Sequence, residues 1–318
     1  MRSEDHEQNH QRRLWTYHAP KPLDMGQTFT ELAKMARTTV RLHPRPGTPG
    51  RDDSSMGGPL LWPSDEQWPR CAQFDQHDSF SGIDLPTDPL PLVAVLQIFA
   101  RDVPELPFPQ GTDLCQVLWC PLDHDDVGCA PAVTVLWRDS SSISDPLLEH
   151  PPADPLHSED DYLPRPCVLS PERVTEYPDP GDLSWDFQQR IQQWENEAIH
   201  DWSYFYHLSA APGTKVGGWV AWIQDPAWPA CEAGHEMQHL LTIASRESDG
   251  QSWKTWTPVE DRGRLGWHPS NVNGRPVRVP LVPDQKPADI MIGDAGSLYV
   301  FTCTRCDHRP TLALMQCS

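Results

Sequence analysis

Four residues near the C-terminus have side chains and a spacing that could bind a metal ion. Cys303 and Cys306 form a C-x-x-C pair, and Cys231 and His235 lie together in the motif "CEAGH". Thiolates and imidazoles are the usual ligands of structural zinc, which takes four of them in tetrahedral geometry. The sequence therefore allows a zinc site, or a metal-dependent enzyme, at these four positions. The alternative is that Cys303 and Cys306 are unligated thiols at the end of a strand.

A second metal hypothesis comes from His235 and His239, because "HEMQH" matches the H-E-x-x-H motif of zinc proteases. That motif needs a helix, which places both imidazoles on one face. Here it leads into "MQHLLTIAS", an apolar run typical of a strand. On a strand the two histidines would lie about 13 Å apart. The sequence also contains no G-x-S-x-G elbow, P-loop or G-x-G-x-x-G motif. These observations favour a protein without catalysis.

A pattern of rare residues occurs twice along the chain. The arrangement G-G-x3-W-x5-W-P-x-C covers residues 57–71 and again residues 217–231, so that matched residues are 160 positions apart. Each copy precedes an apolar run and then a strand-like stretch that ends at cysteine. These stretches are residues 90–100 and 114–121 after the first copy, and 237–245 and 296–306 after the second. The repeat indicates an internal duplication.

This order of segments predicts an α+β protein, rich in β-structure, with two mostly antiparallel β units and a few flanking helices. The chain divides into a polar N-terminal tail (1–27), a first half (28–140), an acidic, proline-rich connection (141–182) and a helix with a second half (183–318).

Three local patterns predict individual elements. A short helix should begin with Thr28 as its N-cap and lead into a strand at residues 38–44. Apolar residues at helical spacing predict a second helix over residues 183–199. Residues 201–209, "DWSYFYHLS", are typical of a strand.

The overall charge limits the classes of partner. The chain has 318 residues and a formal net charge of −20, which argues against binding nucleic acid or an anionic membrane. Fifteen acids and only three bases lie between Asp123 and Asp186. The N-terminus has no apolar signal segment and no apolar run is long enough to span a bilayer, so we expect a cytoplasmic protein. Most of its nine cysteines should then be free thiols.

Tryptophan suits a join between two halves, since the ring supplies contact area and the indole N–H donates a hydrogen bond. We therefore predict a monomer with a Trp-rich cleft that binds a protein or peptide segment. Because the chain is acidic, we expect this segment to be basic. An immunity protein whose acids cover a basic toxin site is a further alternative. The predicted cleft residues are Gly57, Gly58, Trp62, Gln97, Gly217, Gly218, Trp219, Trp222, Gln224 and Trp228.

The chain resembles the bacterial YwqG-like family in "KVGGWVAWIQDPAWPAC", "MQHLLTIAS", "IGDAGSLYVFTCTRC" and the first-half block "MGGPLLWP" with "LVAVLQI". The resemblance implies a duplicated, β-rich α+β fold and a protein-binding scaffold without established catalysis. It extends distantly to programmed-cell-death-type proteins, which chaperone a ribosomal protein. Relatives often carry a cysteine before the Gly-x-x-Met of the second copy, where this chain has Ala233. A paired-cysteine metal site would therefore need His235 as the replacement ligand.

Overall fold

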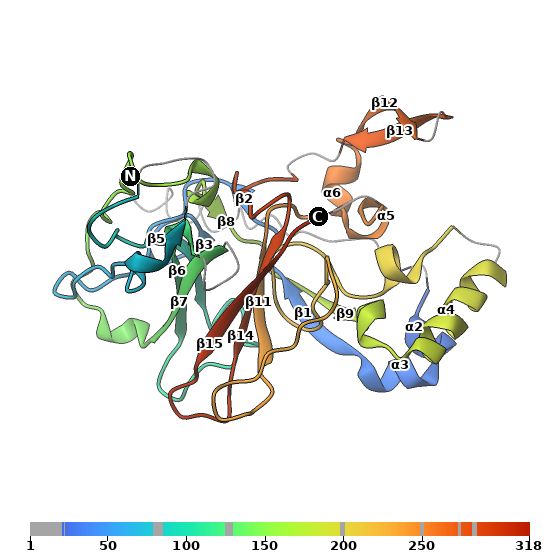
Figure 1. Cartoon of the computed structure of the whole chain (residues 1–318), viewed down its shortest axis with the longest axis horizontal. Helices are drawn as coiled ribbons and strands as arrows, with labels where there is room; N and C mark the ends of the chain where they lie inside the picture. Colours follow the sequence, from blue (N-terminus) through green and yellow to red (C-terminus); the bar gives the residue numbers. More distant parts are fainter. Residues whose placement is uncertain are drawn as a thin grey trace, which may run out of the picture.

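The computed structural model describes residues 21, 23–78, 85–124, 130–197, 201–248, 251–272, 275–281 and 285–318. Two large antiparallel sheets dominate it, and a few short helices flank them (Figure 1). The predicted fold class, a β-rich α+β protein, is confirmed. Among the described residues, no helix combines the length and apolarity needed to cross a bilayer.

The first sheet is formed mainly by residues of the first half. Its hydrogen-bonded order is β2-β8-β3-β5-β6-β4, and β7 pairs with the other edge of β6. The strands are β2 (Arg45–Pro46), β3 (Ser55–Met56), β4 (His77–Asp78), β5 (Val93–Phe99), β6 (Leu114–His124), β7 (Ala130–Arg138) and β8 (Cys167–Val168).

The second sheet has the order β15-β14-β11-β10-β1-β9. Its strands are β1 (Arg37–Arg41), β9 (Glu172–Glu176), β10 (Lys215–Gly217), β11 (Gln238–Ala244), β14 (Ser297–Thr302) and β15 (Thr311–Gln316). A separate hairpin of β12 (Gly266–Val272) and β13 (Arg275–Leu281) projects from the body of the molecule beyond α6 (Figure 1).

Both sheets contain the same run of four antiparallel strands, β3-β5-β6-β7 in the first and β10-β11-β14-β15 in the second. Each run also has a register shift at the same place, between Ala94 and Leu96 on β5 and between His239 and Leu241 on β11. This is the arrangement that the internal duplication predicts, and the duplication remains our hypothesis for it.

Helices α2, α3 and α4 lie together at one end of the molecule (Figure 1). Helix α4 buries Phe187 and Ile191 against Phe29 and Leu32, so its apolar spacing explains its position. Of the helix expected over residues 183–199, Trp185–Glu197 is confirmed; residues 198 and 199 lie outside the described residues. The α-helices are α2 (Met25–Thr28), α3 (Thr30–Met35), α4 (Trp185–Glu197), α5 (Trp253–Trp256) and α6 (Val259–Arg262). The 3-10 turns are η1 (Phe74–Gln76), η3 (Ser140–Ser142), η4 (Asp160–Tyr162) and η5 (Pro180–Asp182).

Two local predictions were wrong. Thr28 does not cap a helix: it ends α2, whose N-cap is Asp24, and the extended Phe29 separates α2 from α3. Residues 201–209 do not form a strand, because Tyr204–Leu208 form a π-helical turn, η6. The His207 ring stabilises that turn by accepting a hydrogen bond from the Ser203 N–H at 2.9 Å.

Two segments pair across the predicted division of the chain. Strand β1 comes from the first half of the sequence but pairs with β10 of the second sheet. The segment 141–182 contributes β8 to the first sheet and β9 to the second, so it is part of the fold and not only a connection. Residues 1–20 and 22 of the predicted tail lie outside the described residues.

A single apolar cluster joins the two sheets. It contains Val95 and Val117 of the first sheet together with Leu241 and Val300 of the second, all buried. The two halves therefore share a core instead of facing each other across an open space.

Candidate metal centres

The structure brings together the four metal ligands that the sequence predicts. We call Cys231, His235, Cys303 and Cys306 the second-half cluster, and their donor atoms all lie within 4.8 Å of one another. The Cys231 and Cys306 Sγ atoms are 3.8 Å apart, and the His235 Nδ1 lies 3.7 Å from the Cys303 Sγ and 3.5 Å from the Cys306 Sγ. Tetrahedral zinc, with bonds of about 2.3 Å to sulfur and 2.0–2.1 Å to nitrogen, places its ligand atoms about 3.5–3.8 Å apart. The donor set and its spacing fit that ion.

Backbone hydrogen bonds position these side chains. The Cys231 N–H donates to the His235 carbonyl at 2.9 Å, and the Met237 N–H donates to the Pro229 carbonyl at 3.0 Å. This tight turn directly before β11 places His235 beside Cys231. Cys303 directly follows β14, and its N–H donates to the Pro310 carbonyl at 3.0 Å across the turn that leads to β15.

The two cysteines of the C-x-x-C pair differ in acidity. Burial raises the pKa of Cys303, but N–H donors from Arg305 and Cys306 and the His235 ring outweigh it and lower that pKa to about 6. The hydrogen bond with Cys303, together with burial, raises the pKa of Cys306 to about 11. One thiolate, the form that binds a metal, is therefore available near neutral pH.

His239 is not part of the cluster. It lies on β11, buried, with its Nδ1 2.9 Å from the Gly217 carbonyl oxygen and its Nε2 2.9 Å from the Thr242 hydroxyl. Since a carbonyl only accepts, Nδ1 carries the proton and Nε2 accepts from Thr242. The strand expected here is confirmed, and the H-E-x-x-H motif does not chelate a metal.

A second cluster was missed in the sequence. We call Cys71, His77, Cys120 and His124 the first-half cluster; all four are buried, and their donor atoms also lie within 4.8 Å of one another. The signal that could have found it is the repeat itself, because Cys71 matches Cys231. Cys120 ends the strand-like stretch that follows the first copy, whereas His77 and His124 have no local motif.

The tryptophans of the second copy donate their indole hydrogen bonds within the chain. Trp222 is buried, and its indole N–H and that of Trp228 donate to the two carboxylate oxygens of Asp182, at 3.2 and 2.6 Å. The Trp219 indole donates to the Met35 carbonyl at 2.8 Å. Each indole N–H already has a partner within the chain, and these bonds connect the second copy to α3 and η5.

The polar groups of Trp62 and Gln97 in the first half also have hydrogen-bond partners within the chain. Trp62 is buried, its indole donates to the Glu66 carbonyl at 3.0 Å, and the Arg138 guanidinium lies over its ring. Gln97 is fully buried; its amide oxygen accepts from the Leu61 N–H at 2.7 Å, and its NH₂ donates to the Arg51 carbonyl at 2.7 Å. These contacts hold the loop before the first Trp.

The remaining predicted cleft residues lie in or beside the turns. Gly57 follows β3, Gly58 is buried, Gly217 ends β10 and Gly218 follows it. Gln224 is exposed, but its side chain donates to the Cys317 carbonyl at 2.9 Å. Five of the ten predicted cleft residues are therefore buried in the interiors of the two halves, and binding of a protein segment in a Trp-rich cleft stays a prediction.

A buried ion pair holds the Gly-Gly turn of the second copy. The Lys215 ammonium lies 3.0 Å from the Glu176 carboxylate and donates to the Trp219 carbonyl, and both side chains are fully buried. The same carboxylate accepts the N–H groups of Ala211 and Trp219. Burial lowers the pKa of Lys215, an effect that Glu176 opposes.

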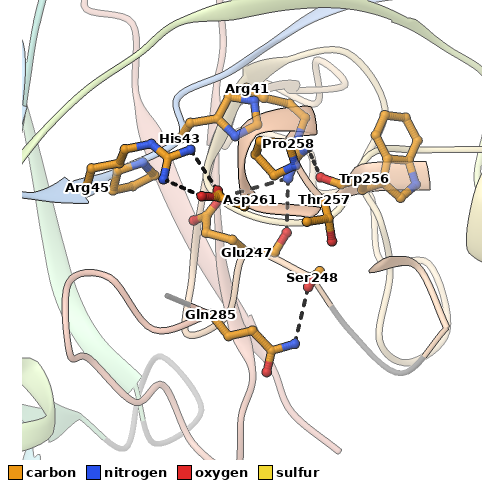
Figure 2. A pocket seen from close by; sticks show the side chains of 11 residues that line it. Arg41, His43, Arg45, Glu247, Ser248, Trp256, Thr257, Pro258, Asp261 and Gln285 are labelled. Atoms are coloured by element: carbon orange, nitrogen blue, oxygen red, sulfur yellow. Dashed lines mark hydrogen bonds and ion pairs between the residues drawn. The ribbon is translucent and has the colours of Figure 1, made fainter. Parts of the chain in front are cut away.

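A polar pocket lies where β1 meets α5 and α6, with charged side chains pointing toward one another (Figure 2). Arg41 donates to the carbonyls of Trp256 and Glu247 at 2.8 and 3.0 Å, and Arg45 pairs with Asp261 at 2.8 Å. The cavity is about 30 Å³, enough for one or two water molecules. Its charges are paired internally, which favours a structural role.

No protein-family model matches this chain, and a search of curated proteins found no match. The resemblance to the YwqG-like family therefore rests on the motifs alone.

Proposed function

We propose that this chain is a zinc-binding protein and that the second-half cluster holds one structural Zn²⁺. The observation that carries the proposal is the geometry: three sulfurs and one imidazole nitrogen come from two separate segments and lie within 4.8 Å of one another, with three of their separations at 3.5–3.8 Å. These separations suit one tetrahedral ion.

The coordination number supports a structural role over a catalytic one. Catalytic zinc uses three protein ligands and leaves a position open for water or substrate, whereas four protein ligands close the coordination shell. The ion would link the loop that carries Cys231 and His235 to the turn between β14 and β15. We accordingly propose a non-catalytic scaffold whose second half is stabilised by the metal.

Metal analysis tests this proposal. The proteins are purified under reducing conditions and washed with chelator before their zinc content is measured. The Cys303→Ser variant should contain one equivalent of zinc less than the wild type. Cys317→Ser is the matched control, because Cys317 is a half-buried free thiol near the same end of the chain but outside the cluster. Equal zinc contents in the two variants would contradict the proposal.

Binding of a basic protein segment is a second candidate function. We propose that an acidic surface would bind this segment. It is favoured by the net charge of −20 and by the exposed acids Glu149, Asp160 and Asp161, which accompany the exposed Leu148 and Leu156. Such a field attracts a basic partner, and salt weakens the attraction.

An oligo-lysine peptide provides the probe for this second candidate. Neutralising the three acids (Glu149→Gln, Asp160→Asn, Asp161→Asn) should weaken its binding several-fold at low salt. The control neutralises three exposed acids elsewhere, Asp65, Asp75 and Asp88, and so changes the net charge equally. Equal weakening in both triple variants would show a general charge effect and no specific surface.

A further inference from the structure

The first-half cluster places four metal-binding side chains inside an apolar region. Cys120 and His124 are fully buried on β6, and Cys71 and His77 are 4% and 7% exposed. The Cys120 Sγ lies 3.2 Å from the His77 Nε2, and the Cys71 Sγ lies 3.6 Å from the His124 Nε2. A zinc ion bound to sulfur and imidazole requires a separation of about 3.5 Å between such atoms.

The backbone around Cys71 matches the backbone around Cys231. The Cys71 N–H donates to the Leu90 carbonyl and the Leu92 N–H donates to the Pro69 carbonyl, at 2.8 and 3.0 Å. In the second half, Cys231 and Met237 make the corresponding two bonds to His235 and Pro229. Both Trp-Pro-x-Cys loops are thus held in the same way against the start of the next strand.

The register of the sheets also equates Cys120 with Cys303. The pairs Val93–Trp119 and Gln238–Thr302 are the first pairs of β5 with β6 and of β11 with β14. Both pairs precede the register shift noted above, and a cysteine directly follows Trp119 and Thr302. Each half therefore places two cysteines at equivalent positions of its sheet.

The other two ligands come from different places in the two halves. In the second half they are His235, before β11, and Cys306, in the C-x-x-C turn. In the first half a longer connection after Cys71 brings β4 beside the end of β6, where His77 pairs directly with His124. The first half reaches four ligands by strand pairing, without any short motif.

We propose that the first-half cluster binds a zinc ion of its own, as a closed Cys2His2 site. The ion would connect the Trp-Pro-x-Cys loop of the first half to β4 and β6. It would stabilise the first half as the ion of the second-half cluster stabilises the second half. This proposal does not depend on the second-half site.

Charge explains why this cluster can be buried. Two thiolates and two neutral imidazoles balance the two positive charges of Zn²⁺, so the complete site is neutral and can lie among Leu90, Leu118 and Leu122. Three thiolates and one imidazole leave one negative charge at the second-half cluster. There His235 and Cys306 are partly exposed, where water stabilises that charge.

Metal content and ligand type test the proposal together. The full chain, purified under reducing conditions, should carry two zinc ions, and X-ray absorption should report five sulfur and three nitrogen ligands over the two ions. This measurement uses the unaltered protein, so it does not depend on a variant that folds. A single ion with three sulfurs and one nitrogen would overturn the proposal and leave the second-half site standing.

Variants locate the second ion. Cys120→Ser and His77→Ala should each lower the zinc content from two to one, whereas His77→Cys, which keeps a ligand, should retain both ions. Cys115→Ser is the matched control, since Cys115 is buried on the same strand but outside the cluster. Retention of both ions in Cys120→Ser, or a mass showing a Cys71–Cys120 disulfide in the purified protein, would also overturn the proposal.

Discussion

The two halves place a cysteine at the same two positions but complete their clusters with different ligands. The first half adds two histidines and buries the whole cluster, while the second adds one histidine and one cysteine and leaves two ligands partly exposed. If both clusters bind zinc, the neutral site is the buried one and the negatively charged site is the accessible one. The difference teaches that ligand identity and burial are coupled through the charge of the complete site.

The largest effect should come from removing a ligand of the buried site. Cys120→Ser should destabilise the protein by about 5 kcal/mol or more, because metal binding free energy is folding free energy. For a chain of 318 residues that corresponds to a fall in melting temperature of about 7 °C or more, measurable by calorimetry. Cys115→Ser, the control, should melt within a few degrees of the wild type. Equal melting of the two variants would contradict a structural metal in the first half.

The next comparison concerns two buried polar networks, the Glu176–Lys215 ion pair of the second half and the hydrogen bonds of Gln97 in the first half. Glu176→Ala leaves the Lys215 ammonium buried without its partner, which should cost about 3–5 kcal/mol. Gln97→Ala leaves only neutral groups unpaired, at about 1–3 kcal/mol. Urea unfolding of both variants measures the difference, and an equal or reversed order would show that the ion pair is not the stronger constraint.

Acid should distinguish the halves, because β11 buries His239 where β5, in the equivalent register, carries Ala94. Burial, followed by the charge of Lys215, lowers the pKa of His239 to about 3. The unfolded chain binds this proton below its ordinary pKa of about 6.5, so the stabilising effect of neutral His239 is complete above that pH and declines as the pH falls toward 3.

Between pH 7 and pH 5 the wild type should therefore lose about 2 kcal/mol more stability than His239→Gln. Comparing the two proteins at each pH removes the contribution of the metal ligands, which titrate in both. Parallel pH dependences would contradict this, because they would mean that the His239 ring binds its proton over the same pH range in the folded and unfolded states.

The smallest effect concerns two matched glycines, Gly57 and Gly217, which have φ of +63° and +62°. A Cβ at Gly57 would lie 2.5 Å from the Pro164 carbonyl oxygen, whereas one at Gly217 would meet nothing within 4 Å. Gly217→Ala should thus cost only the left-handed backbone penalty of about 1–2 kcal/mol, and Gly57→Ala about 1 kcal/mol more. Denaturant midpoints of the pair check this order; a reversed order would contradict it.

The fold was largely predictable from patterns that act locally. Alternating and continuous apolar runs identified β5, β11 and β14, and the spacing of Phe187, Ile191 and their neighbours identified α4. The 160-residue repeat anticipated the shared strand order. Thr28 was misassigned because a capping pattern cannot show that Phe29 will adopt an extended backbone.

The candidate sites were predictable only where the ligands are close in sequence or match a motif. The C-x-x-C spacing identifies Cys303 and Cys306 as candidate ligands, and only three residues separate Cys231 from His235. His77 and His124 meet only because β4 pairs with β6, and that long-range pairing has no signature in either segment. The burial of Trp62, Trp219 and Trp222 could not be predicted, because a ring that fills a core and a ring that lines a cleft are the same residue type.

The sequence by itself determined the supply of thiols, imidazoles and indoles, the charge of −20 and the periodicity that makes the chain a β-rich protein. The tertiary structure alone decided which donors lie within 4.8 Å of one another and which tryptophans are buried. The physical reason is that ligand geometry and burial depend on contacts between distant segments, and only the packed sheets bring those segments together.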